Sequence, residues 1–232
     1  MALPAFALSL AGCGLENIPV LSQPGSPLAS GTSFQFRKIA ANGNPVDVEE
    51  QGFRGYDLYY RIYDINASLD VNILTIEELQ LTFRRLTSYN SSQGTVLSSP
   101  LVEIDPTDFT NEFTIVVDFS GDLNDASRPS IYSVSVTPPP PPPPPAVPIS
   151  ISDFRRGVTY SGLSETKRFD DFASMDADIS YNPQIWTDID NGNLVIIALY
   201  VVSFGVDPLY GALYSLPLYL NNIQIILPDP IP

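Results

Sequence analysis

The feature that most constrains the fold is an apolar run late in the chain, residues 194–206, which reads LVIIALYVVSFGV. The run is too short to cross a bilayer, because a membrane-spanning helix needs about 20 apolar residues. A strand that is apolar on both faces is stable only where both faces are covered. We therefore expect a central strand with a packing layer on each side, preceded by a tight turn at Asn191 and Gly192.

Alternation of apolar and polar residues recurs along the rest of the chain and predicts mostly β structure. Residues 56–63 show it most clearly: the even-numbered positions are apolar or aromatic, and the odd-numbered ones mix Tyr59 and Tyr63 with charged residues. We expect the even face to point inward and the odd face to be half-solvated. Other expected strands are residues 33–39, 113–119, 131–136, 149–158, 213–220 and 222–227.

Residues 75–86 are the best helix candidate. Thr75 followed by Glu78 is a capping-box pattern, in which each side chain bonds the other residue's backbone amide. Arg84 and Arg85 would stand in the last turn, where positive charge suits the helix dipole. The apolar residues also alternate here, so a strand stays open: Leu79, Leu81 and Phe83.

Eight consecutive prolines occupy residues 138–145. They predict a polyproline II segment of roughly 25 Å, at about 3.1 Å per residue. Proline lacks an amide hydrogen, so this segment cannot be a central strand. We interpret it as a stiff spacer or projecting loop, and a ligand for a proline-binding module is the alternative.

Charge and composition exclude several function classes. The net charge is −15 with only 11 basic residues, which argues against binding to nucleic acid. The chain has no histidine, so it offers no imidazole base and no histidine ligand for a metal. One cysteine cannot form an internal disulfide or a zinc knuckle. We predict no enzymatic activity, no resident metal and no cofactor.

Paired aspartates give an alternative hypothesis, an exported hydrolase. Two facing carboxylates can cleave glycosides when one is held protonated. Solvated loops explain the same residues, and we favour that interpretation. The pairs are Asp170 with Asp171, Asp176 with Asp178, and Asp188 with Asp190.

Asp188 and Asp190 are also weak calcium candidates, in a calcium-stabilised adhesion module. Together with Asn191 and Gly192 they partly resemble a calcium loop, but the glycine stands one position early. No glutamate follows at the twelfth position, which is Leu199.

Tyrosines are the candidates for a binding surface, because exposed tyrosines are good anchors for a partner. Core positions with a solvated hydroxyl explain tyrosines as well, and we favour that interpretation. The candidates are Tyr59, Tyr63, Tyr89 and Tyr210.

The first residues carry a resemblance. Residues 1–12 are apolar and uncharged, and they resemble the apolar region of a secretory signal. Leu10, Ala11, Gly12 and Cys13 resemble a bacterial lipobox. The resemblance implies cleavage between Gly12 and Cys13, diacylglycerol on the Cys13 sulfur and an acyl group on the new amino terminus. A buried structural cysteine is the alternative, and residues 13–32, rich in Pro, Ser and Gly, would form a flexible tether.

Residues 55–61 read GYDLYYR, and residues 198–205 are followed by YSLP at 214–217. The first segment resembles the third strand of a fibronectin type III module, and the other two segments resemble its last two strands. The same combination resembles lipoproteins of the spirochaete type. The resemblance implies that these strands neighbour each other in one antiparallel sheet of an immunoglobulin-like β-sandwich.

Spacing bears on the domain organisation. The module has about 100 residues, and here the two matches lie much farther apart in sequence than that length allows. We therefore expect one composite sandwich over residues 33–232, with a large insertion, a short helix and a polyproline segment at 138–148. Two small modules, 33–137 and 149–232, are the alternative.

Together these features predict a membrane-anchored lipoprotein of the bacterial cell envelope. Its all-β, non-catalytic sandwich would serve binding, adhesion or structure, with a protein or glycan as the ligand. We expect the outer membrane or cell surface rather than the inner membrane.

Overall fold

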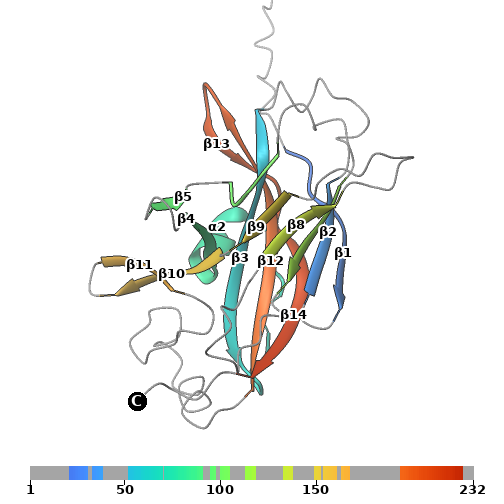
Figure 1. The fold of residues 1–232 in the computed structure, drawn as a ribbon, viewed down its shortest axis with the longest axis vertical. Helices are drawn as coiled ribbons and strands as arrows, with labels where there is room; N and C mark the ends of the chain where they lie inside the picture. The colour runs from blue at the N-terminus through green and yellow to red at the C-terminus, as the bar shows by residue number, and fades with distance from the viewer. Residues whose placement is uncertain are drawn as a thin grey trace, which may run out of the picture.

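A computed structural model shows mainly antiparallel β-strands in two sheets, with one short helix among the residues described (Figure 1). The expectation of an all-β fold with minor helix is confirmed. The structure describes residues 21–30, 33–38, 52–69, 71–90, 95–97, 100–104, 113–118, 133–137, 149–152, 154–160, 163–167 and 194–226. The expected turn at Asn191 and Gly192 and the polyproline segment lie outside these ranges.

The smaller sheet has five strands in the order β1-β2-β7-β8-β9, each antiparallel to its neighbour. Its strands are β1 (Gly25–Ser30), β2 (Ser33–Lys38), β7 (Phe113–Asp118), β8 (Ser133–Thr137) and β9 (Ile149–Ser152). Phe34 and Phe36 on β2 and Ile115 and Val117 on β7 are buried, as the alternation predicts.

The larger sheet has nine strands, and its main path runs β11-β10-β4-β3-β12-β13. Beside this path β14 pairs with β12, β5 with β4, and β6 with β3. The strands are β3 (Phe53–Asp64), β4 (Arg84–Asn90), β5 (Thr95–Leu97), β6 (Val102–Glu103), β10 (Phe154–Tyr160), β11 (Leu163–Lys167), β12 (Leu194–Asp207), β13 (Gly211–Tyr214) and β14 (Leu218–Ile226).

The apolar run forms β12, at the centre of this sheet. One edge of β12 pairs with β3 from Val195 to Gly205, and the other edge pairs first with β14 and then with β13. Odd-numbered residues up to Val201 face the smaller sheet, and even-numbered residues face the opposite way. The prediction of a central strand covered on both faces is confirmed.

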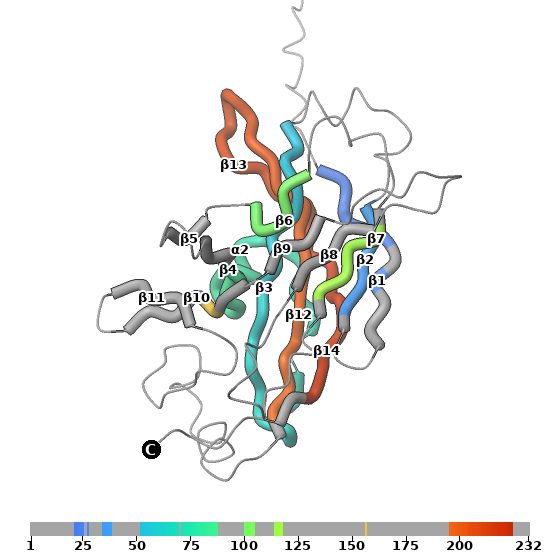
Figure 2. Tube along the Cα trace, viewed as in Figure 1, coloured from blue at the N-terminus to red at the C-terminus, as the bar shows by residue number. Residues whose placement is uncertain are grey.

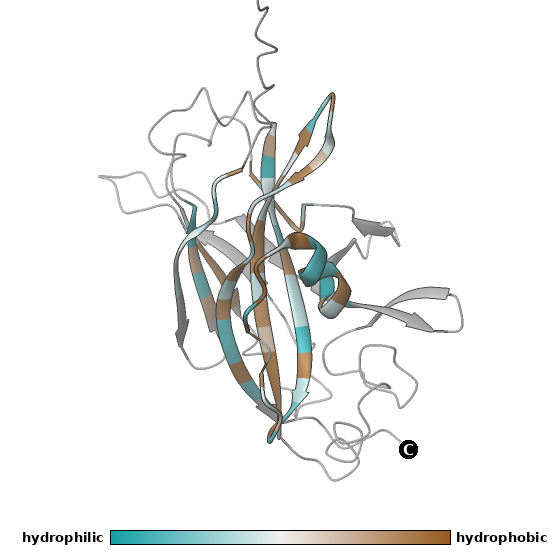
Figure 3. Cartoon of the chain, turned by 180° about the vertical axis from the view of Figure 1, so that it is seen from behind, coloured by the Kyte–Doolittle hydropathy of each residue, from teal (hydrophilic) through white to brown (hydrophobic). Residues whose placement is uncertain are grey.

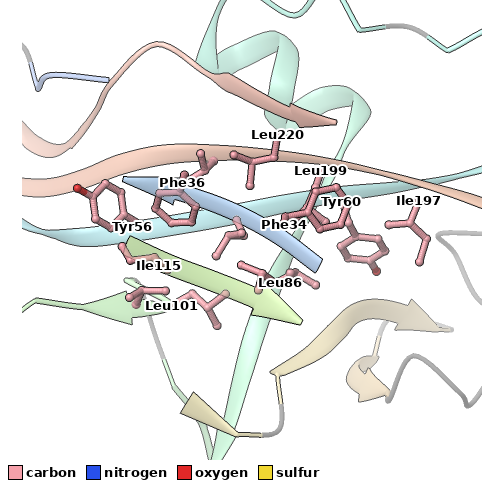
Figure 4. Packing of buried hydrophobic residues seen from close by; sticks show 14 of the residues in the cluster. Phe34, Phe36, Tyr56, Tyr60, Leu86, Leu101, Ile115, Ile197, Leu199 and Leu220 are labelled. Carbon is pink, nitrogen blue, oxygen red and sulfur yellow. The ribbon is translucent and has the colours of Figure 1, made fainter. Parts of the chain in front are cut away.

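The main core lies between the two sheets. Phe34, Phe36 and Ile115 point from the smaller sheet toward Tyr60 and Leu199 of the larger sheet (Figure 4). Because β3 and β12 both supply side chains to this core, strands from both halves of the chain bury one continuous apolar surface.

A second core lies on the outer face of the larger sheet, under the helix α2 (Ile76–Thr82) (Figure 3). Leu79 and Phe83 pack there against Tyr200 of β12, and the Phe83 and Tyr200 rings meet edge to face at 5.0 Å. The expectation that the odd face of β3 is half-solvated is wrong, because α2 and its flanking segment cover it: Tyr59 and Tyr63 are buried.

The helix begins as predicted and ends earlier. The Glu78 amide donates to Thr75 Oγ1 at 3.2 Å, and the Glu78 carboxylate accepts from the Thr75 amide, so the capping box is complete. Phe83 is already extended, and Arg84 and Arg85 belong to β4 rather than to the last helical turn. Pairing of Arg85 with Tyr59 on β3 outweighs the helix-dipole preference of these arginines.

Two strand boundaries also differ from expectation. The expected strand 149–158 is two strands in different sheets, β9 and β10. The expected break at residue 221 is a bulge inside β14, where Asn221 has a φ of 113°, and the true break is the β13–β14 connection that contains Pro217.

Candidate functional site

Most residues predicted to carry function lie outside the described residues. This applies to the lipidation site at Gly12 and Cys13 and to every candidate aspartate. Those aspartates are Asp170, Asp171, Asp176, Asp178, Asp188 and Asp190. Tyr89 lies on β4, but its side chain also falls outside the described part.

Tyr59 and Tyr63 are not part of an exposed surface. Only 3% of Tyr59 and 5% of Tyr63 is solvent-accessible, and both rings pack in the outer core. The Arg61 guanidinium lies 4.9 Å from the centre of the Tyr63 ring, a cation–π distance. These two tyrosines therefore stabilise the fold, as the core interpretation of the tyrosines predicts.

Sequence reasoning missed a buried carboxylate, Asp57, in the middle of β3. The Leu101 amide donates to its Oδ1 at 2.9 Å, and the Arg85 guanidinium lies 3.7 Å from its Oδ2. Asp57 is fully buried, whereas the Arg85 side chain keeps 31% of its surface in water. The available signal was a single acid inside an aromatic strand, since a buried acid needs a partner.

The charges of Asp57 and Arg85 act on the hydroxyls of two tyrosines, Tyr59 and Tyr214. Burial raises the pKa of Tyr59 to about 12; the Asp57 charge adds to the effect, and a hydrogen bond from Gln80 opposes it. Burial and the Asp57 charge also raise the pKa of Tyr214. Both hydroxyls therefore stay protonated at neutral pH, and they can take part in hydrogen bonds without acting as bases.

The fourth tyrosine candidate, Tyr210, lies on an exposed hairpin between β12 and β13, and 43% of its surface is exposed. We call Val206, Leu209 and Tyr210 the hairpin tip. Leu209 is 83% exposed, and Val206 is exposed as well. The hairpin extends away from the body of the larger sheet, and Figure 3 shows hydrophobic segments along it that alternate with hydrophilic and neutral ones.

A local hydrogen-bond pattern shapes this tip. Asp207 Oδ1 accepts hydrogen bonds from the amides of Leu209, at 2.7 Å, and Tyr210, at 2.9 Å. This is an Asx-type turn, in which the carboxylate replaces a backbone acceptor. Sequence analysis could have found the tip, because Asp207-Pro208 and Gly211 are turn residues that enclose two large apolar side chains.

Comparison with known proteins identifies no family: no family model, no curated protein and no solved structure matches the chain. Within the described ranges, no group of three or more acidic or cysteine side chains is arranged to hold a metal ion. Across the same ranges, no helix combines the length and apolar character that crossing a bilayer requires.

Proposed function

We propose that this chain is a lipoprotein of the bacterial cell envelope, with Cys13 as its acyl anchor. Its β-sandwich would have no catalytic activity and would serve binding, adhesion or a structural role, with a protein or a glycan as the ligand. The observation that carries the proposal is the position of the only cysteine, directly after an apolar, uncharged run and the residues Leu10, Ala11 and Gly12. Two or three acyl chains, at about 0.8 kcal/mol per buried CH₂, would hold the protein on a bilayer.

The path of the first described residues supports this arrangement. Leu21, Ser22 and Gln23 lie beside the last residues of β12, at the hairpin end of the larger sheet (Figure 1). Because residues 25–30 form β1, the chain joins the domain before that strand. An anchor on this side would leave the opposite end of the larger sheet farthest from the membrane. The loops there would be the ones presented to a ligand.

The pairing of strands supports a fibronectin type III-like sandwich as the finer assignment. Residues 55–61 lie on β3 and residues 198–205 on β12, and these strands are antiparallel neighbours. The third matching segment, 214–217, begins at the last residue of β13 and leads into β14, and both of these strands pair with β12. These are the neighbour relations that the resemblance implies.

Metabolic labelling with an alkyne fatty acid in a bacterial host tests the anchor. The full chain should incorporate label, and Cys13→Ser should abolish both the label and recovery in the membrane fraction. A matched control moves the thiol: Ser22→Cys in the Cys13→Ser background keeps one cysteine but takes it out of the lipobox. Label that persists in Cys13→Ser, or appears equally in the relocated variant, contradicts the proposal.

Accessibility to protease on intact cells tests the proposed localisation. A surface-exposed lipoprotein should be cleaved without permeabilisation, whereas one that faces the periplasm should be cleaved only after the outer membrane is opened. Cleavage only after the inner membrane is also lysed would contradict an envelope location.

A further inference from the structure

The hairpin tip combines high exposure with an almost complete lack of charge. In a chain with a net charge of −15, Asp207 is the sole charged residue between positions 191 and 228. Leu209 is 83% exposed in the turn between β12 and β13, close to Val206 and Tyr210, which are each 43% exposed. The other exposed large apolar residues of the described part, Leu74, Leu81 and Leu216, lie outside this hairpin. A water-facing hairpin needs no such side chains, so the composition of this tip calls for an explanation.

Two backbone amides at the hairpin tip already have hydrogen-bond acceptors within the protein. An amide that enters a bilayer must keep a hydrogen-bond acceptor, because none is available from lipid tails. At the tip the amides of Leu209 and Tyr210 already donate to Asp207 Oδ1, and the flanking strand residues pair across the hairpin from Phe204 with Tyr214 to Asp207 with Gly211. The apolar side chains can therefore leave water without exposing these two amides.

The first described residues, Leu21 to Gln23, lie close to the strand that leads into this tip. Traced backward, Gln23 donates to the Pro217 carbonyl at 2.6 Å and the Ser22 carbonyl accepts from Ser203 Oγ at 2.6 Å. A Cβ built on Gly205 would lie 3.2 Å from Cδ1 of Leu21. The contacts of this segment thus advance along β12 in the direction of the hairpin.

Chain length then limits how far the anchor can be. Residues 13 and 21 are eight steps apart, which in any conformation span at most about 29 Å. β12 ends at Asp207, two residues beyond Gly205, and Leu209 follows in the turn, so it lies at most roughly 13 Å from Gly205. An acylated Cys13 would therefore bring the membrane within reach of the hairpin tip.

We propose that the hairpin tip is a second membrane contact, in which Leu209 enters the acyl boundary of the bilayer and Tyr210 lies at its headgroup level. Tyrosine suits that level because its ring is apolar and its hydroxyl is polar. The net negative charge favours a zwitterionic rather than an anionic lipid surface. This inference rests on the proposed function for the nearby membrane, and its test does not depend on biological acylation.

The test couples the thiol of Cys13 in the full chain to a maleimide lipid in phosphatidylcholine vesicles. Leu209→Trp reports on the tip, and Leu81→Trp is the matched control, because Leu81 is 86% exposed and lies on α2. Both variants keep Trp186, so the signal of the uncoupled parent chain can be subtracted. Emission is compared in vesicles with and without brominated acyl chains, which quench tryptophan only at membrane depth.

The expected result is a blue shift and loss of emission for Leu209→Trp in brominated vesicles, with Leu81→Trp unchanged. As a second measurement, Leu209→Ser in the Cys13→Ser chain should partition into vesicles roughly tenfold more weakly than its parent, as expected for one lost apolar side chain.

Three results would overturn the inference. A tip tryptophan that stays in water on coupled vesicles would assign the patch to a protein partner. A concentration-dependent blue shift without vesicles would assign it to a second copy of the chain. Equal quenching at positions 81 and 209 would show general adsorption. Chemical coupling replaces biological acylation, so the two tests are independent. If the tip tryptophan does not enter the vesicle membrane, the result of Cys13 labelling in cells is unaffected. If Cys13 is not labelled in cells, the vesicle result is unaffected.

Discussion

Gly55 offers the sharpest test of the packing, because its backbone and its surroundings both exclude a side chain. Gly55 has a φ of 150°, and a Cβ on it would lie 1.9 Å from the Val102 carbonyl oxygen. It stands at a bulge where Arg54 is the extra residue of β3 against β12. β6, the strand that carries Val102, pairs antiparallel with this end of β3, and Figure 2 shows the two next to each other.

The cost of Gly55→Ala has two parts. A positive φ costs an alanine about 1–2 kcal/mol. The approach of the added Cβ to the Val102 oxygen falls roughly 1.5 Å short of a van der Waals distance, so β6 would have to move. Leu101, Val102 and Ile104 are buried there, and each contributes about 1.5–3 kcal/mol when fully buried. Partial loss of these contacts brings the total to about 3–5 kcal/mol.

Gly211→Ala is the matched control. Gly211 has a φ of 80°, but a Cβ there would meet no atom within 4 Å. Only the conformational cost applies, so we expect about 1 kcal/mol. The difference between the two variants isolates the steric clash with β6.

Urea unfolding, followed by circular dichroism on the full chain carrying Cys13→Ser, measures both changes. With an m-value of about 2 kcal/mol/M, the midpoint should fall by roughly 1.5–2.5 M for Gly55→Ala and about 0.5 M for Gly211→Ala. If the Gly55→Ala chain does not fold at all, that outcome also agrees with the prediction, as its most severe form. Coincident curves for the two variants would refute the reasoning.

Three further predictions concern the outer core. Thr75→Ala should remove the capping box and cost about 1 kcal/mol in urea unfolding, whereas Thr82→Ala, which loses one exposed hydrogen bond, should cost less. Arg85→Met should destabilise by about 1–3 kcal/mol, and a double-mutant cycle with Asp57→Asn should show that the costs are not additive. The free energy of unfolding should fall as pH rises from 10 toward 12. Burial raises the pKa of Tyr59 in the folded chain from 10.0 to about 12, so the unfolded chain loses this proton first. Tyr59→Phe should flatten the decline, and an unchanged alkaline slope in this variant would contradict the prediction.

Periodicity predicted the central parts of the fold. β12 is central because no polar face exists along residues 194–206, and period-two patterns located β2, β3 and β7 with small errors at their ends. The capping box located the start of α2, because it is a local hydrogen-bond pattern that two side chains specify. These features depend on a few neighbouring residues, so sequence was sufficient.

The features that sequence missed depend on distant partners. Arg84 and Arg85 suit a helix end equally well, and only pairing with β3 makes them part of a strand. The sequence of β3 alone predicts that its odd-numbered face is half-solvated, whereas in the structure α2 covers that face. The pairing of Asp57 with Arg85 and with the Leu101 amide joins residues 28 and 44 positions away, which no local pattern encodes.

The two ends of β12 show how one strand can serve both stability and contact. Over most of its length β12 has neighbours on both edges and packing on both faces, so it is held in place. Its pairing with β3 ends at Gly205, and the amide of Val206 donates to the carbonyl of Gly52, the residue before β3, at 2.9 Å. Beyond that bond the hairpin continues with β13 alone. The apolar tip is therefore fixed in direction by a strand that is buried over most of its length, while the tip itself remains outside the core. A membrane contact needs that combination, because a tip on a flexible loop would lose its apolar contacts to conformational entropy.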